Sequence, residues 1–215
     1  MASKSTSWAL LLLLAVCLVA GADAVTVAME NMCNFTVWPA AISAEEDDGP
    51  YGFELGAGRT GTFNFPEPPR RTVIWGRTGC HYDSDGFTCE TGNCGELACS
   101  SSIEQTLMML PRLKGTIPTI AYLSRYGNDE GMGNSAAAED DDYRYTIFAS
   151  LPMIFHREFF NLPMEFICIT ATGKPISRVR CMEPDCPDGG RQIGDGLLCP
   201  KTSSLKLTFC PDPRA

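Results

Sequence analysis

The sequence predicts an all-β protein, an antiparallel sandwich or barrel built from short strands. Three observations predict this fold class. Runs of Val, Ile, Thr and aromatic residues recur along the chain, and Gly, Pro and Asp separate these runs at short intervals. The chain also carries 11 cysteines, enough for a framework of disulfides. Short strands separated by turn residues are typical of sandwiches and barrels.

Eight runs are predicted to be strands, because each is rich in β-branched or aromatic residues and is bounded by turn-forming residues. In chain order they are residues 26–31, 35–42, 61–65, 71–80, 116–123, 143–149, 164–171 and 204–210. Residues 101–110, SSIEQTLMML, fit a short helix capped by Ser102 and Gln105 or a further strand, and both interpretations stay open.

The chain is acidic, with a formal net charge of −9 at pH 7. Two acidic stretches, residues 45–50 and 128–142, lack apolar residues to bury and are predicted to be solvated loops. No basic block offers a footing for nucleic acid or for an anionic membrane. Neutral polymers and basic proteins are the partners that remain.

Residues 1–24 are predicted to be a signal peptide. Lys4 supplies the positive start, WALLLLLAVCLVAG forms a short apolar core, and Ala22–Ala24 fits a small-x-small cleavage site. The apolar run is too short for a permanent membrane span, and no later segment is apolar enough to form one. Removal of this leader would leave residues 25–215 as one domain with its charge still −9, because the leader carries one Lys and one Asp. We therefore expect a secreted protein.

The cysteines are predicted to form disulfides. Loss of the leader takes Cys17 and leaves ten, an even number that predicts five bridges in an oxidising compartment. The four cysteines from Cys80 to Cys99 are spaced nine, five and five apart, without the Cys-x₂-Cys pair of zinc or redox sites. The DSDG segment Asp83–Gly86 has its glycine too early for an EF-hand and is interpreted as a turn. We therefore expect no metal and no cofactor.

The segment Asn34–Thr36, NFT, is the single N-glycosylation sequon of the chain. It follows Cys33 directly and starts a predicted strand. Asn34 is therefore a candidate glycosylation site, although a strand that closes early would hide it from the glycosylation machinery.

Seven short segments occur in a characteristic order. They are NMCNFTVWPAAI at 31–42, IWGRTGC at 74–80, CETGNCGELAC at 89–99, FNLPMEF at 160–166, VRC at 179–181, CPDG at 186–189 and LTFCP at 207–211. In this order they resemble the thaumatin-like family, the pathogenesis-related group five proteins of plants. The sequence departs from the family pattern at Asn93, where the family has an aspartate, and at Asp85, where it has a glycine. The resemblance covers nearly all of residues 25–215.

The resemblance implies a disulfide-stapled β-sandwich of about ten strands with a reduced second domain, because large members carry sixteen cysteines. Residues 100–160 are longer than we expect of the small type. The resemblance also implies five bridges: Cys33–Cys210, Cys80–Cys89, Cys94–Cys99, Cys168–Cys199 and Cys181–Cys186. On a chain-entropy estimate, the first bridge contributes about 5 kcal/mol to stability and the Cys80–Cys89 bridge about 2.7 kcal/mol. We therefore expect resistance to heat, acid and proteases.

Family members that bind or cleave β-1,3-glucan are thought to use an acidic cleft lined by one arginine, one glutamate and three aspartates. The arginine position is Val73 here, and Arg71, two residues earlier on the same strand face, is its candidate substitute. Two acidic positions have become tyrosine and two keep a carboxylate. The candidate glycan-binding residues are therefore Arg71, Tyr122, Tyr145, Glu158 and Asp195.

Loss of two acidic positions weighs against a hydrolase, since glycoside hydrolysis needs a pair of facing carboxyl groups. If the protein is an enzyme, Glu158 and Asp195 are its catalytic residues; otherwise none is expected. Two interpretations of Tyr122 and Tyr145 stay open, as rings that stack on sugars or as strand residues packed into a core.

The two histidines do not predict a serine hydrolase. His81 lies within a predicted disulfide loop, and the chain has no Gly-x-Ser-x-Gly nucleophile elbow. His156 is more often an exposed residue than a base, and it is a candidate contact if the protein inhibits a microbial enzyme.

The sequence thus predicts a plant defence protein, secreted to the apoplast and monomeric, that is antifungal through binding of cell-wall β-1,3-glucan. Two alternatives are an inhibitor of a secreted microbial glycoside hydrolase, such as a xylanase, and a weak endo-β-1,3-glucanase. The net charge adds the hypothesis that a basic protein docks on the acidic stretch at Glu139–Asp142.

Overall fold

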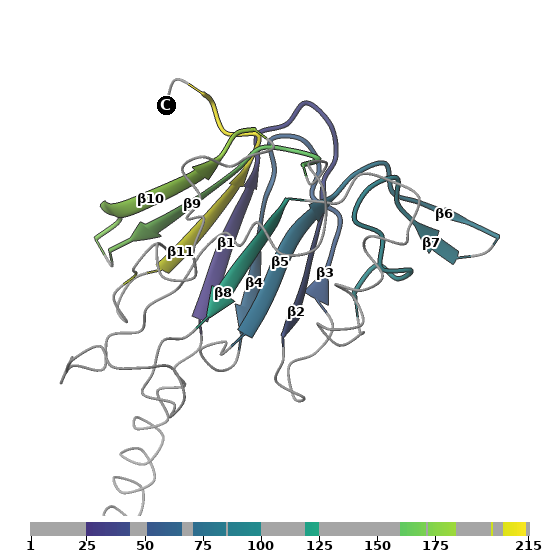
Figure 1. The fold of residues 1–215 in the computed structure, drawn as a ribbon, viewed down its shortest axis with the longest axis horizontal. Coiled ribbons are helices and arrows are strands. Elements are labelled where there is room, and N and C mark those ends of the chain that lie inside the picture. Colours follow the sequence, from purple (N-terminus) through teal and green to yellow (C-terminus); the bar gives the residue numbers. More distant parts are fainter. Residues whose placement is uncertain are drawn as a thin grey trace, which may run out of the picture.

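The computed structural model describes residues 25–43, 51–65, 71–84, 86–99, 119–124, 160–170, 172–183, 199 and 204–213. These residues form two stacked sheets and a separate hairpin (Figure 1). The strands are β1 Val25–Asn31, β2 Trp38–Ser43, β3 Tyr51–Gly52, β4 Thr60–Phe65, β5 Arg71–Arg77, β6 His81–Asp83, β7 Gly86–Thr88, β8 Ile120–Ser124, β9 Met164–Ile169, β10 Pro175–Cys181 and β11 Ser204–Phe209.

The larger sheet has the strand order β10-β9-β11-β1-β4, and the smaller one has the order β3-β2-β5-β8. Neighbouring strands are antiparallel except at one pair. Strands β1 and β11 run parallel, with Val27 opposite Leu205 and Asn31 opposite Phe209. This pairing places the two ends of the domain side by side in the middle of the larger sheet.

The all-β fold class is confirmed, and no helix occurs among the described residues. Seven of the eight predicted strands have a counterpart; the eighth, 143–149, lies outside the described residues, as do 45–50, 101–110 and 128–142. The sequence analysis did not identify β3, β10 or the β6–β7 hairpin. Strand β10 begins with Pro175 and alternates polar with apolar residues at the edge of its sheet, where proline is tolerated.

The main core lies between the two sheets. Alternate residues of the larger sheet point inward, as in β1, where Val27 and Met29 are buried between more exposed neighbours. The smaller sheet contributes Ala41, Ile74 and Ala121 to the same cluster. Burial of this apolar surface is the main term that holds the two sheets together.

The smaller sheet is also covered on its outer face. A second cluster of buried residues lies there: Ala40, Ile42, Val73, Trp75 and Cys99, with Cys94 and Ile120 packed against it. Strand β5 is therefore buried on both faces, from Thr72 to Arg77. A strand buried on both faces lacks the polar alternation of a half-exposed one, which agrees with its sequence TVIWGR.

Four disulfides hold the described parts together: Cys33–Cys210, Cys80–Cys89, Cys94–Cys99 and Cys168–Cys199. They are four of the five pairings that the resemblance implies. Cys181 is also disulfide-bonded, but its expected partner Cys186 lies outside the described residues.

A half-buried asparagine, Asn161, joins strands to loops. Asn161 donates from Nδ2 to the Gly76 carbonyl at 2.8 Å and to Thr91 Oγ1 at 2.8 Å. Its Oδ1 accepts from the Thr119 amide at 2.9 Å. Asn161 therefore ties the end of β5, the loop after the hairpin and the start of β8 to one point.

Within the part of the chain that the structure describes, no helix has the length and apolar character needed to cross a membrane.

Candidate functional site

The residues expected to line a glycan cleft fall in two groups. Arg71 and Tyr122 lie on the adjacent strands β5 and β8, and Tyr122 is the register partner of Val73. Tyr145, Glu158 and Asp195 lie outside the described residues. The structure therefore brings the backbones of Arg71 and Tyr122 together and leaves the expected carboxylates untested.

Val73, at the family's arginine position, is part of a core. It is 3% exposed and belongs to the outer cluster with Ile42, Trp75 and Cys99. An apolar side chain in this place offers no cation to a sugar or to a carboxylate. The outer face of the smaller sheet is thus covered at the point where the resemblance expects a cleft wall.

The outer face is organised by Arg77, a buried arginine at the end of β5. Its Nε donates to the Trp38 carbonyl at 3.0 Å, and its Nη2 donates to the Pro39 carbonyl at 3.3 Å. The same guanidinium donates to the carbonyls of Glu96 at 2.7 Å and Leu97 at 2.6 Å. Arg77 thereby fixes the loop closed by the Cys94–Cys99 bridge onto strand β2.

Burial lowers the pKa of Arg77 from its ordinary value to about 10, while the electrostatic effect of Tyr82 opposes this shift. A pKa of about 10 leaves the guanidinium charged at neutral pH. Its positive charge is met by backbone carbonyl dipoles and by the face of the Phe87 ring, whose centre lies 5.1 Å from the guanidinium carbon.

The β6–β7 hairpin begins just after Arg77. His81 pairs with Thr88, Tyr82 with Phe87 and Asp83 with Gly86. The Cys80–Cys89 bridge closes its base, and below the bridge Thr78 and Thr91 pair through their backbones and through their hydroxyls at 2.8 Å. Gly86 has φ 118°, a conformation that favours glycine, in agreement with the turn expected at DSDG.

The two faces of the hairpin carry different groups. Tyr82 and Phe87 share one face, with ring centres 5.0 Å apart. Phe87 is buried at 5% exposure, whereas Tyr82 is 70% exposed. His81, Asp83 and Thr88 share the other face: His81 Nε2 lies 3.6 Å from Asp83 Oδ2 and 3.3 Å from Thr88 Oγ1. The hairpin therefore presents an aromatic ring and several hydrogen-bonding groups to solvent.

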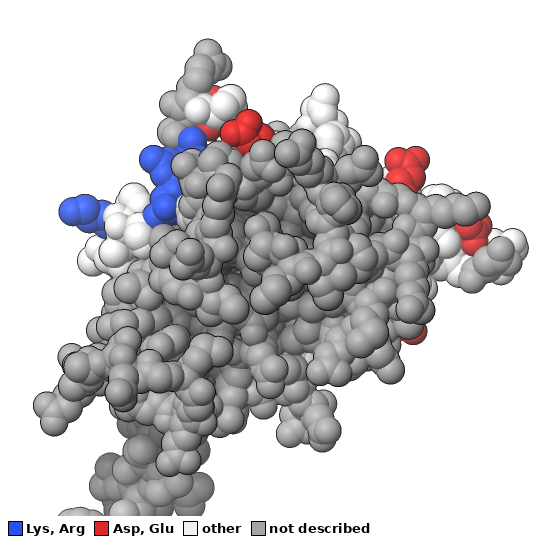
Figure 2. Space-filling model, in the orientation of Figure 1, with Lys and Arg blue, Asp and Glu red and all other residues white. Residues whose placement is uncertain are grey.

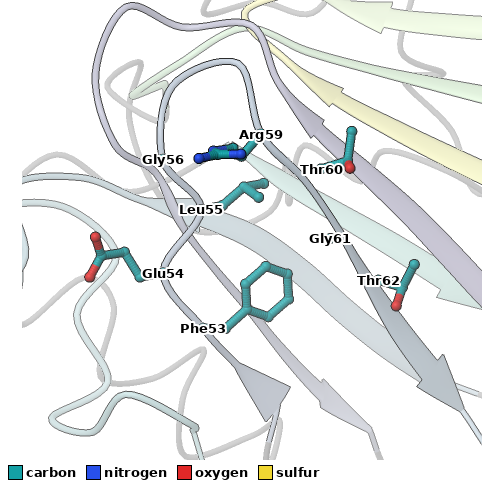
Figure 3. Close-up of a pocket in the computed structure, with 8 residues that line it drawn as sticks. All are labelled: Phe53, Glu54, Leu55, Gly56, Arg59, Thr60, Gly61 and Thr62. Atoms are coloured by element: carbon teal, nitrogen blue, oxygen red, sulfur yellow. The ribbon is translucent and has the colours of Figure 1, made fainter.

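A hollow in the surface lies beside the edge strand β4. This open hollow of about 410 Å³ is lined by Phe53, Glu54, Leu55, Gly56, Arg59, Thr60, Gly61 and Thr62. Figure 3 shows the Phe53 ring directed toward β4 and the Glu54 carboxylate directed away from it. One carboxylate that points away does not make the facing pair that glycoside hydrolysis requires.

Figure 2 shows charged side chains of the described residues at the rim of one face. Blue side chains gather over β10 with a red cluster directly beside them, and further red side chains lie toward the β6–β7 hairpin. On β10, Arg178 and Arg180 both pair with the buried Glu165 of β9. Among the described residues, no three His, Cys, Asp or Glu side chains gather as a metal site would require.

Sequence reasoning did not assign a role to Arg77, Tyr82 or Phe87. A usable signal for Arg77 was its position, since a charged residue ending the apolar run TVIWG is expected to be buried with partners. Tyr82 carried no signal of this kind, because its exposure depends on how the hairpin projects.

The chain is similar to known proteins in sequence and in structure. The model of the thaumatin family matches residues 31–114. A thaumatin-like pathogenesis-related protein 4 of Avena sativa is 33% identical over 214 residues, covering 98% of this chain and 100% of the relative. The thaumatin-like protein PWIR2 of Triticum aestivum is 32% identical over 212 residues, covering 96% and 99%.

Among solved structures, the thaumatin-like xylanase inhibitor TLXI superposes with a TM-score of 0.54 and 25% sequence identity, covering 86% of this chain and 99% of that protein. The full-length sequence similarity, the disulfides and the two-sheet fold all indicate the same family. The chain belongs to the thaumatin family of plant pathogenesis-related proteins.

Proposed function

We propose that this protein acts in plant defence by binding and inhibiting a secreted microbial glycoside hydrolase, such as a xylanase. The observation that carries the proposal is the structural likeness to a thaumatin-like xylanase inhibitor, which extends over nearly all of that inhibitor. Four disulfides in the described residues support action in an oxidising compartment, and we place the protein in the apoplast.

The residue found at the family's arginine position supports a binding protein over a glucanase. Val73 is apolar and buried there, so this position supplies no charge to a sugar cleft. Tyr82, the most exposed large hydrophobic side chain of the described residues, lies instead on the β6–β7 hairpin, an element suited to contact with another macromolecule.

Binding of fungal β-1,3-glucan is the second candidate function. It is favoured by the neighbouring positions of Arg71 and Tyr122, since Tyr122 pairs with Val73 two residues along β5 from Arg71. These two residue types on adjacent strands suit a sugar, because a tyrosine ring can stack on its apolar face and a guanidinium can donate to its hydroxyls.

The two candidates are separated by two measurements on the mature protein, residues 25–215. The first is the rate of substrate hydrolysis by a panel of secreted microbial xylanases and β-1,3-glucanases, with and without the protein. The second is co-sedimentation with insoluble β-1,3-glucan, with cellulose as the control polymer. We expect inhibition of at least one hydrolase and no selective pelleting. Selective pelleting with β-1,3-glucan and no inhibition of any hydrolase would replace the proposal with the second candidate.

A further inference from the structure

We propose that the β6–β7 hairpin is the inhibitory element, and that it enters the substrate cleft of a basic glycoside hydrolase with Tyr82 at the centre of the contact. This inference rests on the proposed function and names the surface and the kind of partner that the function requires.

Tyr82 is the first observation. It is the most exposed large hydrophobic side chain among the described residues, at 70%, ahead of Met32 at 51%. Phe87 packs against the Tyr82 ring, with the two ring centres 5.0 Å apart, and Phe87 is itself buried against Arg77. An exposed tyrosine on a firm support offers an apolar face and a hydroxyl, and tyrosine is enriched among residues that dominate binding energy.

The second observation is that the base of the hairpin is held by a disulfide and by hydrogen bonds. The Cys80–Cys89 bridge closes its base, and Thr78 and Thr91 add backbone and hydroxyl hydrogen bonds below the bridge. Arg77 anchors its inner face through the Phe87 ring. A contact element that is already ordered loses little conformational entropy on binding, so more of its contact energy remains as affinity.

The third observation is shape. Figure 1 shows β6 and β7 standing apart from both sheets, with the hairpin directed away from the molecule. A projecting hairpin complements a concave site. The substrate site of a glycoside hydrolase is such a concavity, with carboxyl groups on its two sides and ring-stacking positions for sugars. Tyr82 resembles a sugar in two ways. Its ring has an apolar face that can stack, and its hydroxyl can hydrogen-bond to a carboxyl group.

The negative charge of the hairpin region indicates which hydrolases would bind it. Acidic side chains lie in this region of the molecule (Figure 2), with Asp83 on the hairpin and the exposed Glu90 and Glu96 in the chain that follows it. The whole chain carries −9. Such a surface attracts a hydrolase whose cleft rim is basic, and the attraction acts mainly on the association rate.

The test uses a hydrolase that the wild-type protein inhibits, and the variant Tyr82→Ala. We expect its inhibition constant to rise about 30-fold or more, as expected for a central interface tyrosine. The matched control is Ile176→Ala on β10, where an apolar side chain 45% exposed is truncated away from the hairpin; its inhibition constant should stay within about 2-fold. Equal melting temperatures would show that neither change unfolds the protein.

Two further readouts test the details. A soluble oligosaccharide that occupies the cleft should raise the apparent inhibition constant linearly with the oligosaccharide concentration, and raising the salt concentration should slow association. Unchanged inhibition by Tyr82→Ala, or inhibition indifferent to the oligosaccharide, would overturn the hairpin as the inhibitory element while leaving the proposed function intact. A wild-type protein that inhibits no hydrolase would overturn the proposed function itself, and the hairpin proposal with it.

Discussion

The guanidinium carbon of Arg77 lies 5.1 Å from the centre of the Phe87 ring, so the last residue of β5 supports the second strand of the hairpin. The same guanidinium donates to the carbonyls of Glu96 and Leu97 in the neighbouring disulfide loop. One buried cation therefore joins the smaller sheet, the hairpin and the loop. The positions of all three should depend on it.

Substitution of Arg77 should be strongly destabilising. Arg77→Met keeps an unbranched, though shorter, side chain and removes the donors, which leaves the carbonyls of Trp38, Glu96 and Leu97 without this partner. We expect the free energy of unfolding to fall by about 3 kcal/mol or more, because each unsatisfied buried group costs about 1–3 kcal/mol. Chemical denaturation measures this change.

The control is the same substitution at the exposed Arg59, which should change stability by less than about 0.5 kcal/mol. The pKa of Arg77, lowered by burial to about 10 in the fold, leaves the residue charged in both states at neutral pH. Because the folded state binds the proton less tightly, this group raises stability only as the pH rises above about 10. The difference between wild type and variant should therefore be constant from pH 5 to pH 8, and a marked slope there would contradict the assignment.

Asn161 should be essential for the junction between β5 and β8. Asn161→Ala removes two donors and one acceptor that bind Gly76, Thr91 and Thr119. We expect a loss of about 2–4 kcal/mol in the free energy of unfolding, from partners left unsatisfied in a partly buried place. The matched change Asn64→Ala, on the exposed side of β4, should cost less than about 1 kcal/mol. Equal losses at both positions would rule out the junction role.

Gly52 should tolerate no side chain. A Cβ built there would lie 1.9 Å from the Leu97 carbonyl oxygen, a backbone atom that also accepts from Arg77. Gly52→Ala should therefore push the disulfide loop off the sheet and cost about 2–3 kcal/mol. At Gly56 the nearest atom to such a Cβ is Arg59 Cγ at 3.6 Å, so Gly56→Ala is the tolerated control. Thermal unfolding of the two variants, side by side, measures the difference.

The Cys80–Cys89 bridge should keep the hairpin closed. Replacing both cysteines with alanine should lower stability by about 2.7 kcal/mol on the chain-entropy estimate. It should also allow chymotrypsin to cut the backbone after Tyr82 and Phe87. Mass spectrometry identifies the cleavage products. Cleavage at Phe35, which is 44% exposed in another turn, serves as the internal control. If wild type is cut in the hairpin as fast as the variant, the bridge does not order this element.

Asn34 should carry a glycan in the secreted protein. The structure places it, exposed, in the turn between β1 and β2, and not within a strand. Asn31 fixes that turn by donating to the carbonyls of Phe35 and Leu55 and accepting from the Cys33 amide. Protein purified from plant tissue should lose mass on treatment with a peptide-N-glycosidase, and Thr36→Ala should abolish the shift. An unchanged mass in the wild type would show that the sequon is not used.

Much of the fold could be predicted from local sequence. Strands β1, β4, β9 and β11 are runs of β-branched and aromatic residues, and such runs favour extended backbone wherever they occur. The even number of cysteines after the leader, together with the ordered segments of the family, indicated the disulfide framework and the sandwich. The edge strand β10 was not identified, because it begins with a proline and carries two arginines whose partner, Glu165, lies on β9.

The candidate site was decided by tertiary structure. Composition and segment order determined the fold class, the family and the absence of the usual arginine at Val73. They did not reveal that Val73 is buried, that β1 runs parallel to β11, or that Arg77 supports an exposed Tyr82. Each of these depends on which distant segment covers a residue, and the segments concerned are up to 177 positions apart, as the Cys33–Cys210 bridge shows. Local propensity acts over a few residues, whereas burial and exposure are set by contacts between segments that meet only in the folded chain.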